Sequence, residues 1–155
     1  MTALAASLAQ NFLALEPLLI DRLADQLADL QPKVKVISAA DLAGITEDQQ
    51  TTPAVQLVYR GYRVVESNHS NNSARIEQTW LAVVATRNAR KLRTGEAARA
   101  DAGVITRRVL KALMGYRPEG TSKPLRLADA PEAAYSAGYQ YLPLAFVAEL
   151  TVTTV

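Results

Sequence analysis

The end of the chain carries its longest apolar stripe with a period of two. Between residues 142 and 152 one phase is apolar throughout and consists of Leu142, Leu144, Phe146, Ala148, Leu150 and Val152. A period of two predicts a β-strand, and a strand with one continuous apolar face needs neighbouring strands and a layer that covers this face. Pro143 has no N–H to donate, so the strand should lie at a sheet edge or carry a bulge there.

Four other runs predict strands. Residues 75–86 become apolar on both faces toward their end, which predicts a central position in the sheet. The run AVQLVYRGYRVVE changes phase at Gly61, which indicates a β-bulge or a sharp bend. Shorter runs at residues 34–37 and 123–129 predict two minor strands.

Two segments have the spacing of amphipathic helices. The first begins near Pro17 and ends before Pro32, with an apolar stripe formed by Leu19, Leu23, Leu27 and Leu30. The second begins at Thr94 or Gly95 and ends at Gly115, with a stripe formed by Ala98, Ala102, Ile105, Val109 and Leu113.

The order of these elements is α-β-β-β-α-β-β. It predicts an α+β fold in which a mostly antiparallel sheet of four to five strands packs against two main helices. We expect residues 1–155 to form a single domain, with residues 1–14 as an N-terminal arm or an extension of the first helix. Polar or turn-rich loops are expected at residues 38–53, 67–73 and 130–138.

The residues that usually carry chemistry are scarce in this chain. It has no cysteine, and its only histidine, His69, lies in the polar cluster SNHSNNS. No phosphate-binding glycine motif and no G-x-S-x-G motif occurs, so we expect no catalytic, cofactor-binding or metal-binding residues and no enzymatic activity. The apolar beginning of the chain has no positive charge before Arg22, and no run is long enough to span a membrane. A reducing cytoplasm suits such a chain.

Charge is distributed unevenly, although the formal net charge is only +2. The basic candidates for an interface or a DNA channel are Arg87, Arg90, Lys91, Arg93, Arg99, Arg107, Arg108 and Lys111. The acidic candidates for a partner face are Asp21, Asp25, Asp29, Glu47 and Asp48. Segregated charge favours head-to-tail association or a salt-dependent contact with DNA, and a solvated surface is the plainer interpretation of both sets.

Five segments together resemble a known family. They are LEPLLIDRLADQL, TPAVQLVYRGYRV, RIEQTWLAVVATRN, GEAARADAGVITRRVLKALMGYRP and YLPLAFVAEL. In order and phrasing they are similar to the Mu-like phage and prophage tail terminator family, over residues 15–152. The family has no catalytic signature, so no residue role is carried over.

The resemblance implies a structural virion protein that caps the head-proximal end of the tail tube as a homohexameric ring. Such a ring stops tail polymerisation and forms the head–tail joining surface. Its implied partners are other copies, the tube protein, sheath protein in contractile tails, a neck or head-completion protein, and genomic DNA in the channel. The implied location is the virion tail, and the host cytoplasm during assembly. The alternatives are a neck or tail-completion protein at another position, or a nucleic-acid-binding accessory protein that acts through residues 87–117.

Overall fold

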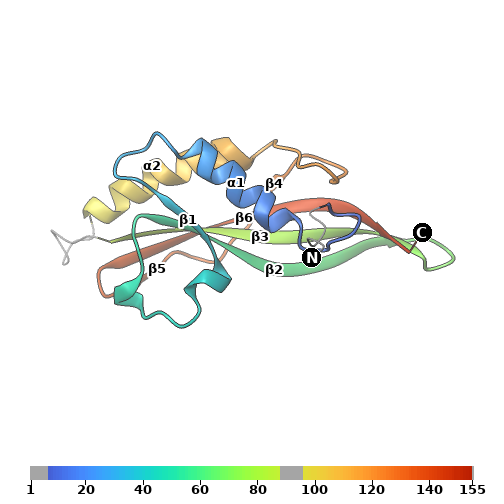
Figure 1. Ribbon diagram of the computed structural model, residues 1–155, viewed down its shortest axis with the longest axis horizontal. Coiled ribbons are helices and arrows are strands. Elements are labelled where there is room, and N and C mark those ends of the chain that lie inside the picture. The colour runs from blue at the N-terminus through green and yellow to red at the C-terminus, as the bar shows by residue number, and fades with distance from the viewer. Residues whose placement is uncertain (1–6, 88–95, 155) are drawn as a thin grey trace, which may run out of the picture.

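The computed structural model describes residues 7–87 and 96–154, except for the side chains of residues 96–100. Its elements in chain order are α1 (Leu15–Gln26), β1 (Lys35–Ser38), the 3-10 turns η1 (Ala39–Leu42) and η2 (Glu47–Gln49), β2 (Ala54–Ser67), β3 (Ser73–Arg87), α2 (Glu96–Leu113), β4 (Arg126–Ala128), β5 (Ala134–Ser136) and β6 (Tyr139–Thr153). Both helices lie on one side of the sheet, and the η1–η2 segment lies on the other side (Figure 1). The predicted α+β class is therefore confirmed.

The sheet has the order β1-β2-β3-β6-β4, with β5 also paired to β6. Only β1 and β2 run parallel; the other pairs are antiparallel. The long strand β3 lies between β2 and β6, which confirms the central position that its two apolar faces predict.

The sheet has six strands, so the prediction of four to five is corrected. The additional strand is β5, within the segment 130–138 that the sequence predicts as a loop. Its three residues are exposed, and the strand is too short to show an alternation of apolar and polar residues. They pair with β6 through a tight turn at Ala137 and Gly138, which both have positive φ angles.

Gly61 produces the predicted bulge in β2. The pairing with β3 advances from Tyr59 opposite Trp80 to Gly61 opposite Thr79, so Arg60 is the extra residue. Gly61 has a φ of 120°, a conformation that L side chains rarely adopt. The extra residue lets Tyr62 face the same side of the sheet as Tyr59.

Pro143 lies where β6 has a strand on one side only. It pairs with Val83 of β3, and on the other side β5 reaches residues 139–141 and β4 reaches residues 145–147. Between these two short strands, no described strand accepts a backbone hydrogen bond from this side of β6. β6 is therefore an inner strand without a bulge, which corrects the predicted edge position, and Pro143 is tolerated because no strand pairs with β6 on its second side at this residue.

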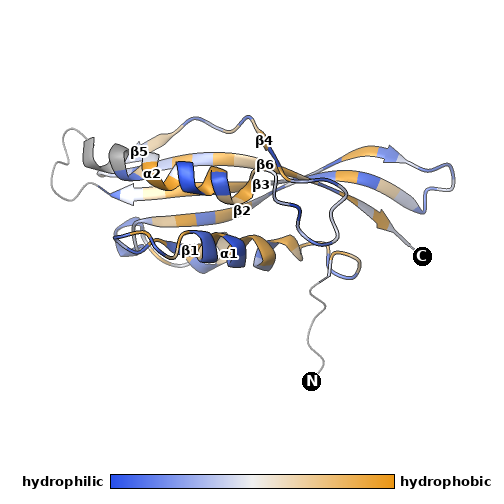
Figure 2. Ribbon diagram, turned by 90° about the horizontal axis from the view of Figure 1, so that it is seen from above, coloured by the Kyte–Doolittle hydropathy of each residue, from blue (hydrophilic) through white to orange (hydrophobic). Residues whose placement is uncertain are grey.

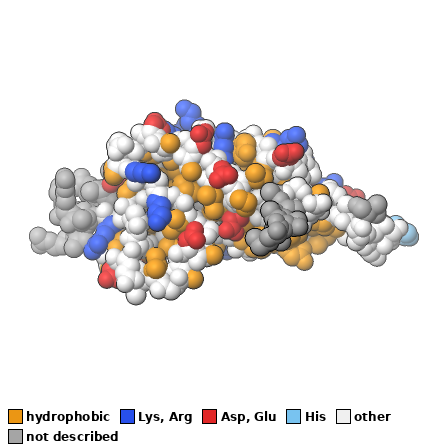
Figure 3. Space-filling model, in the orientation of Figure 1, with side chains coloured by type: hydrophobic (Ala, Val, Ile, Leu, Met, Phe, Trp, Pro, Cys, Tyr) orange, Lys and Arg blue, Asp and Glu red, His pale blue; other side chains and the backbone are white. Residues whose placement is uncertain are grey.

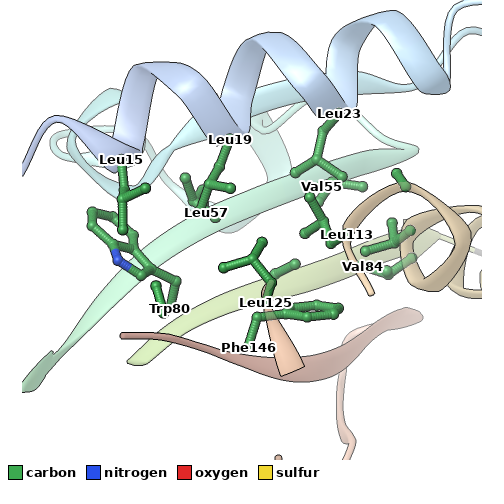
Figure 4. Close-up of a cluster of buried hydrophobic side chains, with 14 of the residues drawn as sticks. Leu15, Leu19, Leu23, Val55, Leu57, Trp80, Val84, Leu113, Leu125 and Phe146 are labelled. Atoms are coloured by element: carbon green, nitrogen blue, oxygen red, sulfur yellow. The ribbon is translucent and has the colours of Figure 1, made fainter. Parts of the chain in front are cut away.

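The core lies between the helices and the sheet. Leu15, Leu19 and Leu23 of α1 point toward Val55 and Leu57 of β2, and the core continues through Trp80, Val84, Leu113, Leu125 and Phe146 (Figure 4). All of these side chains are buried. The apolar stripes of both helices and of β6 therefore meet in one layer, as their periods predict.

The first helix is shorter than its leucine stripe predicts. α1 ends at Gln26, and turn hydrogen bonds from Ala28 to Asp25 and from Leu30 to Leu27 replace the helix before Pro32. The ring of Pro32 disfavours helical geometry at Gln31 alone, so the earlier end of α1 is set by the turns at residues 27–30. The predicted start of the second helix at residues 94–95 lies outside the described residues, and its end at Gly115, with a φ of 77°, is confirmed.

Residues 7–14 form turns that pack on the helix side of the sheet. The side chain of Gln78 in β3 donates a hydrogen bond of 2.7 Å to the carbonyl oxygen of Phe12. Gln78 also accepts a hydrogen bond of 3.1 Å from the indole N–H of Trp80. A buried amide thus connects this segment to the centre of the sheet.

Candidate assembly surfaces

Across residues 7–87 and 101–154, no group of three or more histidine, cysteine or acidic side chains is arranged to hold a metal ion. His69 is exposed in the turn between β2 and β3. No helix in the described ranges is both long and apolar enough to cross a membrane.

Two buried carboxylates on the outer face of the sheet are the most notable titratable pair. Glu77 of β3 and Glu149 of β6 lie directly opposite each other, and each residue is less than 10% exposed. Like charges in this position repel. Four cations offset the repulsion: Arg63 and Arg126 bind Glu77, and Arg75 and Lys123 bind Glu149.

The ion pairs give this cluster a structural role. The hydrogen bond from Arg126, at 2.8 Å, and then that from Arg63, hold the pKa of Glu77 below its ordinary value despite burial. Glu77 therefore stays ionised and links β2, β3 and β4 across the sheet. The sequence did not reveal this cluster, because the partners depend on strand register.

A second network fixes the η1–η2 segment to the outer face. Glu47 accepts hydrogen bonds from the hydroxyls of Tyr141 and Ser136, and the amide of Gln50 donates to the Tyr141 hydroxyl at 2.6 Å. Burial, and then the hydrogen bond to Glu47, raise the pKa of Tyr141 to about 12. The acidic candidate Glu47 thus anchors its own loop.

Two of the sequence candidates pair with each other within the chain. Arg108 of α2 donates to both carboxylate oxygens of Asp29, at 2.6 and 3.1 Å, and to the carbonyl oxygen of Gln26 at 3.0 Å. This bidentate contact lowers the pKa of Asp29 and joins the end of α1 to α2. Asp21 and Asp25 are exposed on α1.

The remaining basic candidates divide into three groups. Arg107 and Lys111 are exposed on α2. The guanidinium of Arg87 lies 5.0 Å above the ring of Tyr139. Arg90, Lys91 and Arg93 lie outside the described residues, as does the side chain of Arg99.

Arg107 and Lys111 line a groove along the outer side of α2. The α2 groove has a volume of about 870 Å³ and is lined by Gly103, Val104, Arg107, Arg108, Leu110, Lys111 and Met114. Val104 is 61% exposed and Met114 is 50% exposed. Apolar and charged positions alternate along this helix in Figure 2. In the sequence, Val104 and Met114 can be recognised as candidate contact residues because they are apolar and lie outside the buried stripe of the helix.

An acidic projection lies on the other side of the sheet. In the η1–η2 segment Ile45 is 43% exposed, and the exposed carboxylates of Asp41 and Asp48 flank it in sequence. We call these three residues the acidic knob. Figure 3 shows charged and apolar side chains mixed over the surface of the molecule, with an apolar area at the base of the projecting β2–β3 end.

The exposed features of this fold suit contact with other macromolecules. They indicate a protein of the assembly class. The model of the phage tail terminator protein family matches residues 8–154. The chain belongs to this family and is a structural protein of a phage tail.

A solved structure shares the fold. A chain of a structure entitled "Virion of native gene transfer agent (GTA) particle" superposes with a TM-score of 0.51 and 17% sequence identity, over 83% of this chain and 84% of that chain. A comparison with curated proteins gives no match. The structural likeness at this identity concerns the fold alone.

Proposed function

We propose that this chain caps the head-proximal end of the tail tube as a homohexameric ring, stops tube polymerisation and forms the surface to which the head or neck binds. The family match over residues 8–154 carries the proposal. The partners are then other copies of the chain, tube protein, sheath protein where the tail contracts, and a head-completion or neck protein.

The surfaces support a contact role for the basic candidates with protein more than with DNA. Within the described part of α2 the exposed cations Arg107 and Lys111 lie one turn apart, and the exposed apolar residues Val104 and Met114 lie at either end of this pair. A phosphate backbone is bound by several cations or by aromatic stacking, and apolar side chains at both ends of a cation pair do not contribute to it.

The test combines mass measurement with electron microscopy. We expect the purified chain to form rings alone or when mixed with tail tubes, and we expect the rings to lie at one end of each tube. Tails assembled without the protein should lose their uniform length. A chain that stays monomeric in both conditions and does not bind tube ends would refute the proposal.

A further inference from the structure

The α2 groove and the acidic knob have complementary chemistry. The groove presents two exposed apolar side chains, Val104 and Met114, beside the cations Arg107 and Lys111. The knob presents the exposed side chain of Ile45, with the exposed carboxylates of Asp41 and Asp48 before and after it in the chain. Along the helix the order is Val104, Arg107, Lys111 and Met114, so each exposed apolar residue lies one turn from a cation. A partner with an apolar residue near an acid fits such a pair, because burial and charge then act in the same direction.

The charged groups of both surfaces are available for a partner. Among residues 7–87 and 101–154, Arg107 and Lys111 make no ion pair. Asp48 accepts a hydrogen bond only from the hydroxyl of its neighbour Thr46, and Asp41 accepts one from the backbone N–H of Ser38 at 3.3 Å. Neither carboxylate is neutralised by these contacts.

The floor of the groove is formed by a glycine. A Cβ atom at Gly103 would have no heavy atom within 4 Å, so the space above this position is open. Arg108, at the side of the groove, is held back by Asp29 and does not extend over it. The groove is thus open at its Gly103 end, beside Val104.

The position of the two surfaces selects the kind of contact. The helices and the η1–η2 segment lie on opposite sides of the sheet (Figure 1). Surfaces on opposite sides of one subunit join copies head to tail, and repetition of such a contact closes a ring when the rotation permits. The acids Asp21 and Asp25 of α1 lie in the same layer as the groove, so they do not provide an opposite surface.

We propose that the α2 groove of one copy receives the acidic knob of the next copy, with Ile45 against Met114 and the knob carboxylates beside Lys111 and Arg107. This inference rests on the proposed ring and specifies which surfaces close it. A second copy of this chain is the occupant because its own knob supplies both the apolar residue and the charges that the groove lacks.

Engineered cysteines test the contact directly. The chain has no cysteine, so Ile45→Cys together with Met114→Cys introduces a single unambiguous pair. A disulfide needs Cα atoms within about 7 Å, and the sheet separates the two positions within one copy (Figure 1). Oxidation of the assembled double variant by copper phenanthroline and oxygen, which take up the two thiol hydrogens, should give a ladder of linked copies on a non-reducing denaturing gel.

The single-cysteine variants are the matched controls. A head-to-tail contact brings position 45 to position 114 and never to itself, so each single variant should remain unlinked. Dimers formed by either single variant would overturn the inference. Because both positions are exposed, thermal unfolding of the variants should match that of the wild type.

Charge reversal gives a second, independent readout. Lys111→Glu and Asp48→Lys should each weaken ring assembly about tenfold, and their combination should recover most of the loss because the pair is restored with opposite polarity. Lys33→Glu, an exposed reversal outside both surfaces, should leave assembly unchanged.

The outcomes separate the two proposals. Rings that form normally but give no ladder, or reversals that are not rescued by their combination, overturn the groove–knob contact and leave the ring intact. Failure to assemble both alone and on tail tubes overturns both proposals.

Discussion

The buried amide of Gln78 offers a test of how the N-terminal segment is held. Gln78→Leu keeps a side chain of similar size and removes both hydrogen bonds of the amide. The indole N–H of Trp80 and the carbonyl oxygen of Phe12 then lose their partners. Gln78 itself is fully buried, so water cannot replace the amide at the indole without rearrangement.

The expected cost follows from the two orphaned groups. A buried donor without a partner costs about 1–3 kcal/mol, and the carbonyl of Phe12, at a part-buried position, adds roughly 1 kcal/mol. Burial of the leucine side chain offsets roughly 1 kcal/mol of this. We therefore expect the free energy of unfolding to fall by about 1–3 kcal/mol, and Tm to fall by about 2–4 °C for each kcal/mol.

The assay is urea unfolding followed by tryptophan fluorescence, since Trp80 is the only tryptophan in the chain. Gln26→Leu is the matched control: its side-chain amide donates a hydrogen bond to its neighbour Asp25 at an exposed position, and its replacement should change stability by less than about 0.5 kcal/mol. Limited proteolysis should cut residues 7–14 faster in Gln78→Leu than in the control. A Gln78→Leu variant as stable as Gln26→Leu would refute the reasoning.

Three further predictions concern the sheet and α2. Arg126 and Arg63 lower the pKa of folded Glu77, so the ionised side chain stabilises the fold above the unfolded-state pKa of about 4.3, and this stabilisation is lost as the pH falls below that value. Glu77→Gln should therefore lose less stability than the wild type between about pH 7 and pH 3, as measured by urea midpoints. Equal losses in the two proteins would contradict this. Gly61→Ala should destabilise the chain by about 1–3 kcal/mol through backbone strain alone. Gly103→Ala, within a helix and without a close neighbour, should stabilise it by about 0.5–1 kcal/mol. Equal effects of the two substitutions in thermal unfolding would contradict the strained backbone at Gly61. In an absorbance titration, Tyr141→Phe should remove the tyrosine that ionises last, near pH 12. An unchanged late phase would show that Tyr141 is not the tyrosine with the raised pKa.

Local periodicity accounts for what could be predicted. The leucine stripe of α1, the apolar face of β6 and the phase change at Gly61 are patterns within one segment, and the structure contains each of them, although α1 ends at Gln26, before the last two leucines of its stripe. These signals depend on the geometry of a helix or strand alone, so they are readable without knowledge of the partners. The family resemblance also follows from segment order, and the match over residues 8–154 confirms it.

Register and layer order decided the rest. The sequence marks Arg108 and Asp29 as members of two different surfaces, and the packing of α1 on α2 brings them together. It shows no link between Glu77 and Glu149, which the pairing of β3 with β6 places opposite each other. Such contacts join residues far apart in the chain, and only the assembled sheet sets their distance.

The sequence by itself thus determined the elements other than β5, their buried faces, the α+β class and the family. Only the tertiary structure decided which charges are already satisfied within the chain and which remain for a partner. It tied Glu47 to Tyr141 and Asp29 to Arg108, and left Arg107 and Lys111 exposed beside apolar side chains. The physical reason is that a charge is available for assembly only when the fold has not already paired it.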